Sequence, residues 1–222
     1  MKRCFIFAAG TFYGLREAPR AGDVTIAADA GLHNCRSAGI EPELVIGDFD
    51  SMAQPPRGGC VVAPVEKDDT DTMLAVREGL ARGCGEFYIY GGTGGVRLDH
   101  TLANLQTLAF LRRHGARGYL YDRDFVYTVL ENETLTLRRQ VEWGLVSLFA
   151  MSGTQQDVTL EGLQYPLAHA DVTGDFPIGV SNHFIADTAR ITCGSGLLLV
   201  GWQLPPLTET PAGRSQAAPP AR

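Results

Sequence analysis

The segment "ELVIGDFDSM", residues 43–52, indicates the fold class, because an apolar run ends there in two aspartates, Asp48 and Asp50. A short, almost purely apolar run is typical of a strand that is buried on both faces of a parallel sheet. Open α/β sheets of this kind bind their ligands beyond the carboxyl ends of the strands. The two carboxylates therefore form either an ordinary turn or a pair of oxygen ligands for a hard cation at the mouth of the sheet.

Similar apolar runs recur through the first 120 residues and alternate with helical patterns. Apolar residues return at helical spacing after residue 71, and again after residue 97 at Leu98, Leu102 and Leu105. This alternation predicts a Rossmann-like α/β domain over residues 1–122, with an open, mostly parallel sheet and flanking helices. The predicted strands are residues 4–8, 24–28, 44–46, 60–62, 87–90 and 118–121.

The pattern changes near residue 122, where a period of two replaces the helical period. We expect a second, all-β domain over residues 123–204, a β-sandwich without helices. Residues 205–222 are rich in proline and alanine and lack apolar periodicity, which predicts a disordered tail. The strands of the second domain are predicted within residues 125–138, 145–151, 157–162, 189–194 and 196–204.

Composition restricts the classes of function. The chain of 222 residues is 45% hydrophobic and 20% charged, as expected of a folded protein with a buried core, and its net charge of −6 argues against nucleic-acid binding. The five cysteines are scattered and include no CxxC pair, which argues against a zinc site or a disulfide framework and favours the reducing cytoplasm. The first apolar run is too short for a secretory signal or a membrane span.

Four stretches carry residues suited to chemistry, and most of them directly follow a predicted strand. Each stretch alone has a structural explanation, because aspartate is a preferred N-cap and glycine pairs are common in turns. Together, carboxylates at one edge of a sheet repel each other unless a cation offsets their charge. The stretches are "AADAGL" with Asp29, "GDFDSM", "EKDDTDTM" with Asp68, Asp69 and Asp71, and "GGTGGVRLDHTLAN" with Arg97, Asp99 and His100.

Oxygen ligands without a neighbouring His or Cys cluster favour Mg²⁺, which completes its coordination shell with water and substrate phosphates. This points to a nucleotide substrate, although the chain has no Walker loop and Arg97 stands where the last glycine of GxGxxG would be. The glycines within residues 91–95 are instead predicted to let backbone N–H groups reach phosphate, assisted by the dipole of the following helix. Arg97 either holds a phosphate or forms a salt bridge to one of the aspartates.

These four stretches, in this order, resemble the thiamine pyrophosphokinase family (thiamine diphosphokinases). "GLQYPL" and "GVSNHF" resemble signatures of that family's β domain, so the resemblance extends from residue 27 to residue 185, whereas "AAGTFYG" matches the family's first loop only loosely. The resemblance implies ATP-dependent transfer of a pyrophosphoryl group to the hydroxyl of thiamine, which gives thiamine diphosphate and AMP. It also implies Mg²⁺ as the cofactor and a homodimer that binds thiamine at the subunit interface.

The same resemblance implies roles for individual residues. Asp99, with Arg97 nearby, would face the thiamine and the transferred group. The chemistry of the transfer, rather than the resemblance, suggests that a carboxylate within reach of the hydroxyl, Asp99 or Asp71, takes its proton. Tyr165 would lie against the pyrimidine ring or belong to the core. The metal and phosphates would be held by Asp48, Asp50 and Asp71, with Asp29 and Ser51 in the same cluster, and the partner subunit would present Ser181 and Asn182 to the aminopyrimidine. The chemistry of phosphate binding adds Lys67, Gly92, Gly94 and Gly95 to the predicted nucleotide site.

Two other functions are compatible with parts of the sequence. A Mg²⁺-dependent glycosyl- or nucleotidyltransferase would also use Asp-x-Asp after a strand, but it would leave "GVSNHF" without a role. A non-catalytic sensor of thiamine or a nucleotide would need fewer carboxylates than the chain carries. Release of AMP from ATP distinguishes the kinase from both alternatives.

Overall fold

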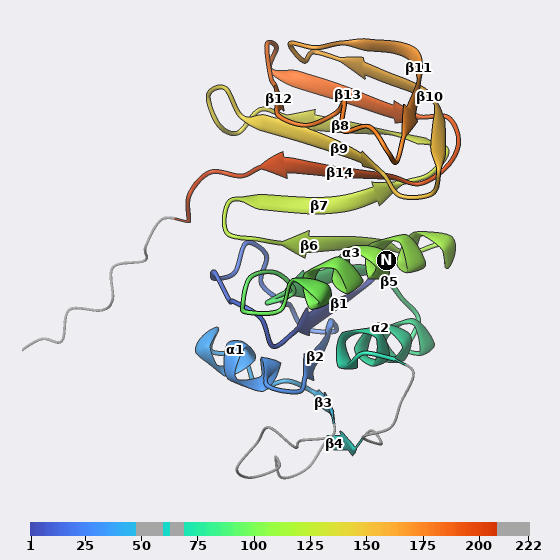
Figure 1. The fold of residues 1–222 in the computed structure, drawn as a ribbon. Helices are drawn as coiled ribbons and strands as arrows, with labels where there is room; N and C mark the ends of the chain where they lie inside the picture. The colour runs from blue at the N-terminus through green and yellow to red at the C-terminus, as the bar shows by residue number, and fades with distance from the viewer. Residues whose placement is uncertain (48–59, 63–68, 208–222) are drawn as a thin grey trace, which may run out of the picture.

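The computed structural model describes residues 1–47, 60–62 and 69–207, which form two β-sheets and three helices (Figure 1). The helices are α1 (Gly31–Ser37), α2 (Asp71–Ala81) and α3 (Leu98–Arg113). The strands are β1 (Lys2–Phe7), β2 (Val24–Ala28), β3 (Leu44–Gly47), β4 (Cys60–Val62), β5 (Cys84–Tyr90), β6 (Arg117–Tyr121), β7 (Phe125–Leu130), β8 (Glu133–Arg138), β9 (Leu145–Ala150), β10 (Thr154–Glu161), β11 (Leu167–Thr173), β12 (Asn182–His183), β13 (Thr188–Cys193) and β14 (Leu198–Gln203).

The larger sheet has ten strands in the order β12-β9-β14-β7-β6-β5-β1-β2-β3-β4, and from β6 to β4 every neighbouring pair is parallel. The chain builds this half outward from β1 to β4 and then returns to β5 and β6 on the other side of β1. The order of the strands therefore reverses between β1 and β5, and sheets of this kind bind ligands in the crevice beyond the carboxyl ends of two such strands. The predicted α/β class with a large, mostly parallel sheet is confirmed.

The parallel strands read as continuous apolar runs because both of their faces are covered. In β1, Ile6 packs with the helix residues Val76 of α2 and Leu108 of α3, whereas Phe5 and Phe7 point to the opposite face, which α1 covers. Burying a side chain of this size stabilises the fold by about 1.5–3 kcal/mol. Successive side chains of a strand point to opposite faces of the sheet, so all of them are buried only where helices cover both faces.

The antiparallel strands β7, β14, β9 and β12 continue the same ten-stranded sheet. A second sheet, in the order β11-β10-β13-β8, shares a core with them, in which Leu148 and Val200 pack with Val158 and Ile191. The predicted domain boundary at residue 122 falls between β6 and β7, which are hydrogen-bonded neighbours. The large sheet is therefore continuous across that boundary, and the division into two domains stays a prediction.

The chain changes sheets at the turn between β7 and β8. Both strands lie within the predicted range 125–138, and Asn132 between them adopts a left-handed φ of 51°, which asparagine tolerates well. However, β7 pairs with β14 and β8 pairs with β13, so the two strands enter different sheets. In the ranges that the structure describes, no helix follows residue 122, and none is long and apolar enough to cross a membrane.

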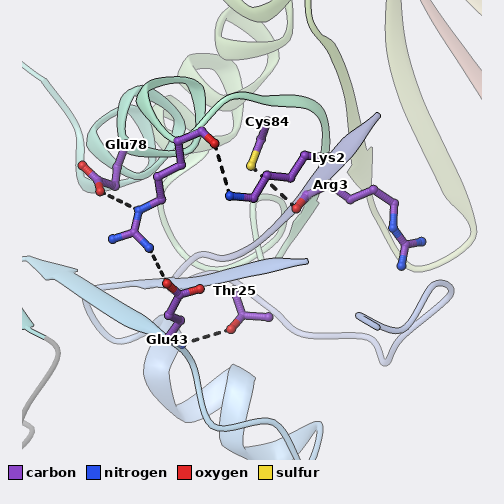
Figure 2. A network of polar contacts seen from close by, with 7 residues as sticks. Lys2, Arg3, Thr25, Glu43, Glu78 and Cys84 are labelled. Atoms are coloured by element: carbon purple, nitrogen blue, oxygen red, sulfur yellow. Dashed lines mark hydrogen bonds and ion pairs between the residues drawn. The ribbon is translucent and has the colours of Figure 1, made fainter. Parts of the chain in front are cut away.

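A polar network joins the amino-terminal ends of the parallel strands to the carboxyl end of α2 (Figure 2). Arg82 donates through Nε to Glu78 at 2.7 Å and through Nη1 to Glu43 at 2.6 Å, while its carbonyl accepts a hydrogen bond from Lys2 Nζ at 3.2 Å. Glu43 directly precedes β3, and its N–H donates to Thr25 Oγ1 at 3.0 Å. Arg82 thus ties α2 to two strands at the end of the sheet opposite the crevice.

Candidate active site at the carboxyl ends of β1 and β5

Two glycine-containing loops meet in the crevice. We call them the β1 loop (residues 8–11) and the β5 loop (residues 91–95). The N–H of Gly10 donates to the carbonyl of Gly91 at 2.7 Å. A Cβ added at Gly10 would lie 2.6 Å from the same carbonyl oxygen, so only glycine permits this approach. The two loops are therefore in direct backbone contact.

A cavity of about 240 Å³ opens beside these loops. The lining includes three predicted site glycines, Gly92, Gly94 and Gly95, as well as Ala8 to Gly10 of the β1 loop. The structure thus brings together residues that are far apart in the sequence. The polar side chains that line the cavity belong to Asp29, Thr70, Asp71, Thr72, Arg97, His100 and Asn104.

The two described carboxylates of the predicted nucleotide and metal site, Asp29 and Asp71, both line this cavity. Asp29 follows β2 and adopts a left-handed φ of 49°, and its N–H donates to the carbonyl of Ile46 at 2.7 Å. Asp71 is the first residue of α2, where a negative charge interacts favourably with the helix dipole. Asp48, Asp50, Ser51 and Lys67 lie outside the described residues.

The structure rejects helix capping as the explanation for two other aspartates. The N-cap of α2 is Thr70, whose Oγ1 accepts the N–H of Met73 at 3.2 Å, and Asp69 instead pairs with Arg77 at 2.7 Å. The N-cap of α3 is Arg97, which makes no side-chain capping bond. Capping therefore does not account for Asp69 or Asp99.

Arg97 and Asp99 form an ion pair at the start of α3. Arg97 donates through Nε to Asp99 Oδ1 at 3.2 Å and through Nη2 to Oδ2. These hydrogen bonds hold the pKa of Asp99 below its ordinary value. Both side chains are more than 60% exposed, so a phosphate can compete for the guanidinium at little cost. The predicted salt bridge of Arg97 is thus present, and Arg97 also lines the cavity.

The residues predicted to contact thiamine, Tyr165, Ser181 and Asn182, do not line this cavity. Asn182 belongs to β12, at the far edge of the ten-stranded sheet, and is not among the residues that line the cavity. Its side chain is buried: Oδ1 accepts the N–H of Tyr165 and of His183, each at 3.0 Å, and Nδ2 donates to the carbonyl of Tyr165 at 2.7 Å. Ser181 and Tyr165 are exposed beside it, Tyr165 by 65%. The core alternative for Tyr165 is therefore wrong.

Among the described residues, no three His, Cys, Asp or Glu side chains gather as a metal site. Three polar residues that hydrogen-bond to the loops or from them were not predicted from the sequence: Asn34, Thr93 and Asn104. Asn104 could have been found, because it follows His100 by four residues and so shares its helix face. Asn34 carries no comparable signal in the sequence.

Two family profiles match the chain. The profile described as "Thiamin pyrophosphokinase, catalytic domain" matches residues 16–120, and "Thiamin pyrophosphokinase, vitamin B1 binding domain" matches residues 132–198. The chain belongs to the thiamine pyrophosphokinase family. Both the α/β half and the β half of the chain thus carry the family's pattern.

Individual members of the thiamine pyrophosphokinase family are similar along most of the chain. The thiamine pyrophosphokinase of Bacillus subtilis (strain 168) is 28% identical over 182 residues, which cover 79% of this chain and 85% of the relative. A crystal structure of the Bacillus subtilis enzyme has a TM-score of 0.82 at 25% identity and covers 92% of this chain and 100% of that one. The enzyme from Geobacillus thermodenitrificans has a TM-score of 0.78 at 26% identity, over 91% and 98% of the two chains.

Proposed function

We propose that this chain transfers a pyrophosphoryl group from ATP to the hydroxyl of thiamine, which gives thiamine diphosphate and AMP. The observation that supports this most directly is the cavity where both glycine loops meet Asp29, Asp71 and Arg97. Family membership favours this activity over a glycosyl- or nucleotidyltransferase and over a non-catalytic sensor.

The phosphates of ATP would bind the glycine loops. Backbone N–H groups in the β5 loop and the N-terminus of α3 offer donors and a favourable dipole to an anion. Arg97 adds a guanidinium that can leave Asp99 for a phosphate. Since phosphoryl transfer depends mainly on positioning and charge neutralisation, these groups supply most of what the reaction requires of the protein.

Mg²⁺ suits the donors that line the cavity. Asp29 and Asp71 supply carboxylate oxygens, which are the ligands that Mg²⁺ prefers, and among the described residues no cysteine lines the cavity to favour a softer metal. Asp48 and Asp50, between β3 and β4, are proposed as further ligands. When bound, the ion would neutralise charge on the phosphates.

Asp71 and Asp99 are the two proposed proton acceptors. The ion pair with Arg97 lowers the pKa of Asp99, which stabilises its charged form until Arg97 turns to a phosphate. Asp71 lines the cavity at the start of α2 and is also a proposed metal ligand. Both residues therefore stay proposed for the hydroxyl proton.

The acceptor site is proposed to include a second subunit. Five strand spacings separate β12 from β5, which is roughly 24 Å at about 4.8 Å per strand, so Ser181 and Tyr165 are too far from the cavity of their own chain to contact thiamine there. A homodimer would bring these residues of one subunit to the cavity of the other. The hydrogen bonds of the Asn182 side chain to the backbone of Tyr165 would hold Tyr165 in place, while Ser181 is held by its N–H bond to Ser147 Oγ.

The test is a reaction of the purified chain with ATP, Mg²⁺ and thiamine, followed by chromatographic separation of the nucleotides and thiamine esters. We expect AMP and thiamine diphosphate in equal amounts, and their loss in Asp71→Asn. A nucleotidyltransferase would release diphosphate instead of AMP. Binding of ATP and thiamine without any AMP would contradict the proposed reaction.

A further inference from the structure

The two loops at the cavity contain residues with unusual conformational freedom. Gly91, Gly94 and Gly95 adopt positive φ values of 65°, 69° and 80°. Glycine reaches these angles without strain, but it also loses more conformational entropy than any other residue when it is fixed. A phosphate-binding loop built from such residues needs contacts from outside the loop to keep one conformation.

Two buried asparagines supply these contacts from opposite faces of the sheet. Asn34 of α1 donates through Nδ2 to the carbonyls of Ala8 and Gly10, at 2.7 and 2.9 Å. Asn104 of α3 donates through Nδ2 to the carbonyl of Gly92 at 2.7 Å. Their exposed fractions are only 9% and 5%. Each amide is thus buried against the carbonyls of a cavity loop.

Asp122, directly after β6, accepts a fourth hydrogen bond, which the β5 loop donates. Thr93, at the centre of the β5 loop and 6% exposed, donates through Oγ1 to Asp122 Oδ1 at 2.8 Å. Its own carbonyl accepts the N–H of Thr11 at 3.0 Å, which joins the β5 loop to the β1 loop. A displacement of either loop would therefore break contacts in both.

We propose that Asn34 and Asn104 are positioning residues that fix the direction of the loop N–H groups before ATP binds. In a trans peptide the carbonyl and the following N–H point in opposite directions. Hydrogen bonds to the carbonyls of Ala8 and Gly92 therefore also fix the peptide units of Ala9, which lines the cavity, and of Thr93, which precedes the cavity residue Gly94. Donors that are already oriented bind an anion without a further ordering cost. This inference rests on the proposed function only in naming ATP as the anion.

The test compares Asn104→Asp with Thr107→Val in the full chain. Aspartate keeps the volume of asparagine but, when ionised, cannot donate to the Gly92 carbonyl. Thr107 is a matched control, because it is one turn further along α3, is 1% exposed, and donates only to Ala103 of its own helix at 3.0 Å. Asn104→Ser, a milder change that also shortens the donor, serves if the aspartate variant fails to fold.

Three measurements are made on each variant: thermal unfolding, hydrogen exchange of residues 8–11 and 91–96 without ligand, and steady-state kinetics with ATP varied. Loss of one hydrogen bond should raise the ligand-free exchange of the loop amides about five- to tenfold in Asn104→Asp. The KM for ATP should rise at least as much, because the new carboxylate also repels the phosphates. The KM for thiamine should change less than about twofold. Thr107→Val should lower the melting temperature but leave both loop exchange and the KM for ATP within about twofold.

Unchanged loop exchange in Asn104→Asp, with a melting temperature lowered as in the control, would show a merely structural role and overturn the inference. The proposed function fails separately. If the wild-type chain binds ATP but makes no thiamine diphosphate, calorimetric ATP affinity replaces KM in the comparison. If it binds no ATP, the exchange of the loop amides alone decides whether Asn104 orients them.

Discussion

The contact between the two cavity loops makes Gly10→Ala the most informative single substitution. The added Cβ would lie 2.6 Å from the carbonyl oxygen of Gly91 and 2.7 Å from that of Thr93. Both are backbone atoms, so no side-chain rotation can relieve the clash, and the loops must move apart. Overpacking of this kind costs about 1–3 kcal/mol, and each lost loop–loop hydrogen bond adds about 0.5–1.5 kcal/mol.

Much of this cost should appear at the cavity, because the loops are the parts that can move. If ATP binding must bring the displaced loops back together at a free-energy cost of about 1.4–2.8 kcal/mol, the affinity for ATP falls about 10- to 100-fold. Titration calorimetry with ATP and Mg²⁺ measures this directly. Thermal unfolding then shows how much of the cost has spread to the whole fold.

Gly174→Ala is the matched control for this experiment. A Cβ at Gly174 would come no closer than 3.6 Å to its nearest neighbour, the carbonyl of Gly153. We expect ATP affinity within about twofold of the wild type, since ordinary van der Waals contact requires no movement. Wild-type ATP affinity in Gly10→Ala would refute the argument that the phosphates bind where these two loops touch.

Three further predictions concern stability and assembly. Burial raises the pKa of Asp23, but its hydrogen bonds with Arg3 and Arg20 outweigh this and lower the pKa below its ordinary 3.8. Asp23→Asn should therefore lower the free energy of unfolding by about 1–3 kcal/mol at pH 7, measured by urea unfolding. The difference in unfolding free energy between wild type and variant should disappear as the pH falls below 3.8 and through the lowered pKa, because Asp23 then becomes protonated in both states. A constant difference down to pH 2 would contradict this prediction. Arg82→Met should cost about 0.5–1 kcal/mol in the same assay and leave the KM for ATP unchanged, because Arg82 lies at the opposite end of the sheet from the cavity; a raised KM would contradict this placement. Mixing and refolding Asp71→Asn with Tyr165→Ala, each inactive alone, should restore about a quarter of wild-type AMP formation if the site is shared between subunits, and nothing if it is not.

The parallel half of the fold could be predicted because burial on both faces leaves an unambiguous pattern. Residues 24–28 were predicted as a strand and form β2 with the same bounds. By contrast, β11 was missed because only one of its residues, Val172, is buried. A strand at the edge of the four-stranded sheet with one buried side chain shows no alternation of apolar and polar residues in the sequence. β12 has only two residues and is defined by pairing alone.

The carboxylates and glycines of the cavity could be predicted because the topology of an α/β sheet gathers the residues that follow its strands. Asp29, Asp71 and Gly92 are placed together for this reason. The loop contacts of Asn34 could not be predicted, because they join residues 24 and 26 positions apart across the packing of α1 on the sheet. Asp69 was ambiguous for a similar reason: Thr70 is the better placed cap, and Asp69 is bound by Arg77 from the next turns of α2.

The distance between the cavity and the residues proposed to contact thiamine follows from the strand order and not from the sequence pattern. A sequence pattern can place Ser181 and Tyr165 in the β half, but it cannot say how far these residues lie from the cavity at the carboxyl ends of β1 and β5. The continuous sheet answers this, because each intervening strand, β6, β7, β14 and β9, adds a fixed spacing between β5 and β12. Tyr165 is nevertheless held out to solvent by the buried amide of Asn182. An ordered, exposed aromatic ring too distant to serve its own cavity is what a shared site between two subunits requires, and the mixing experiment tests this requirement directly.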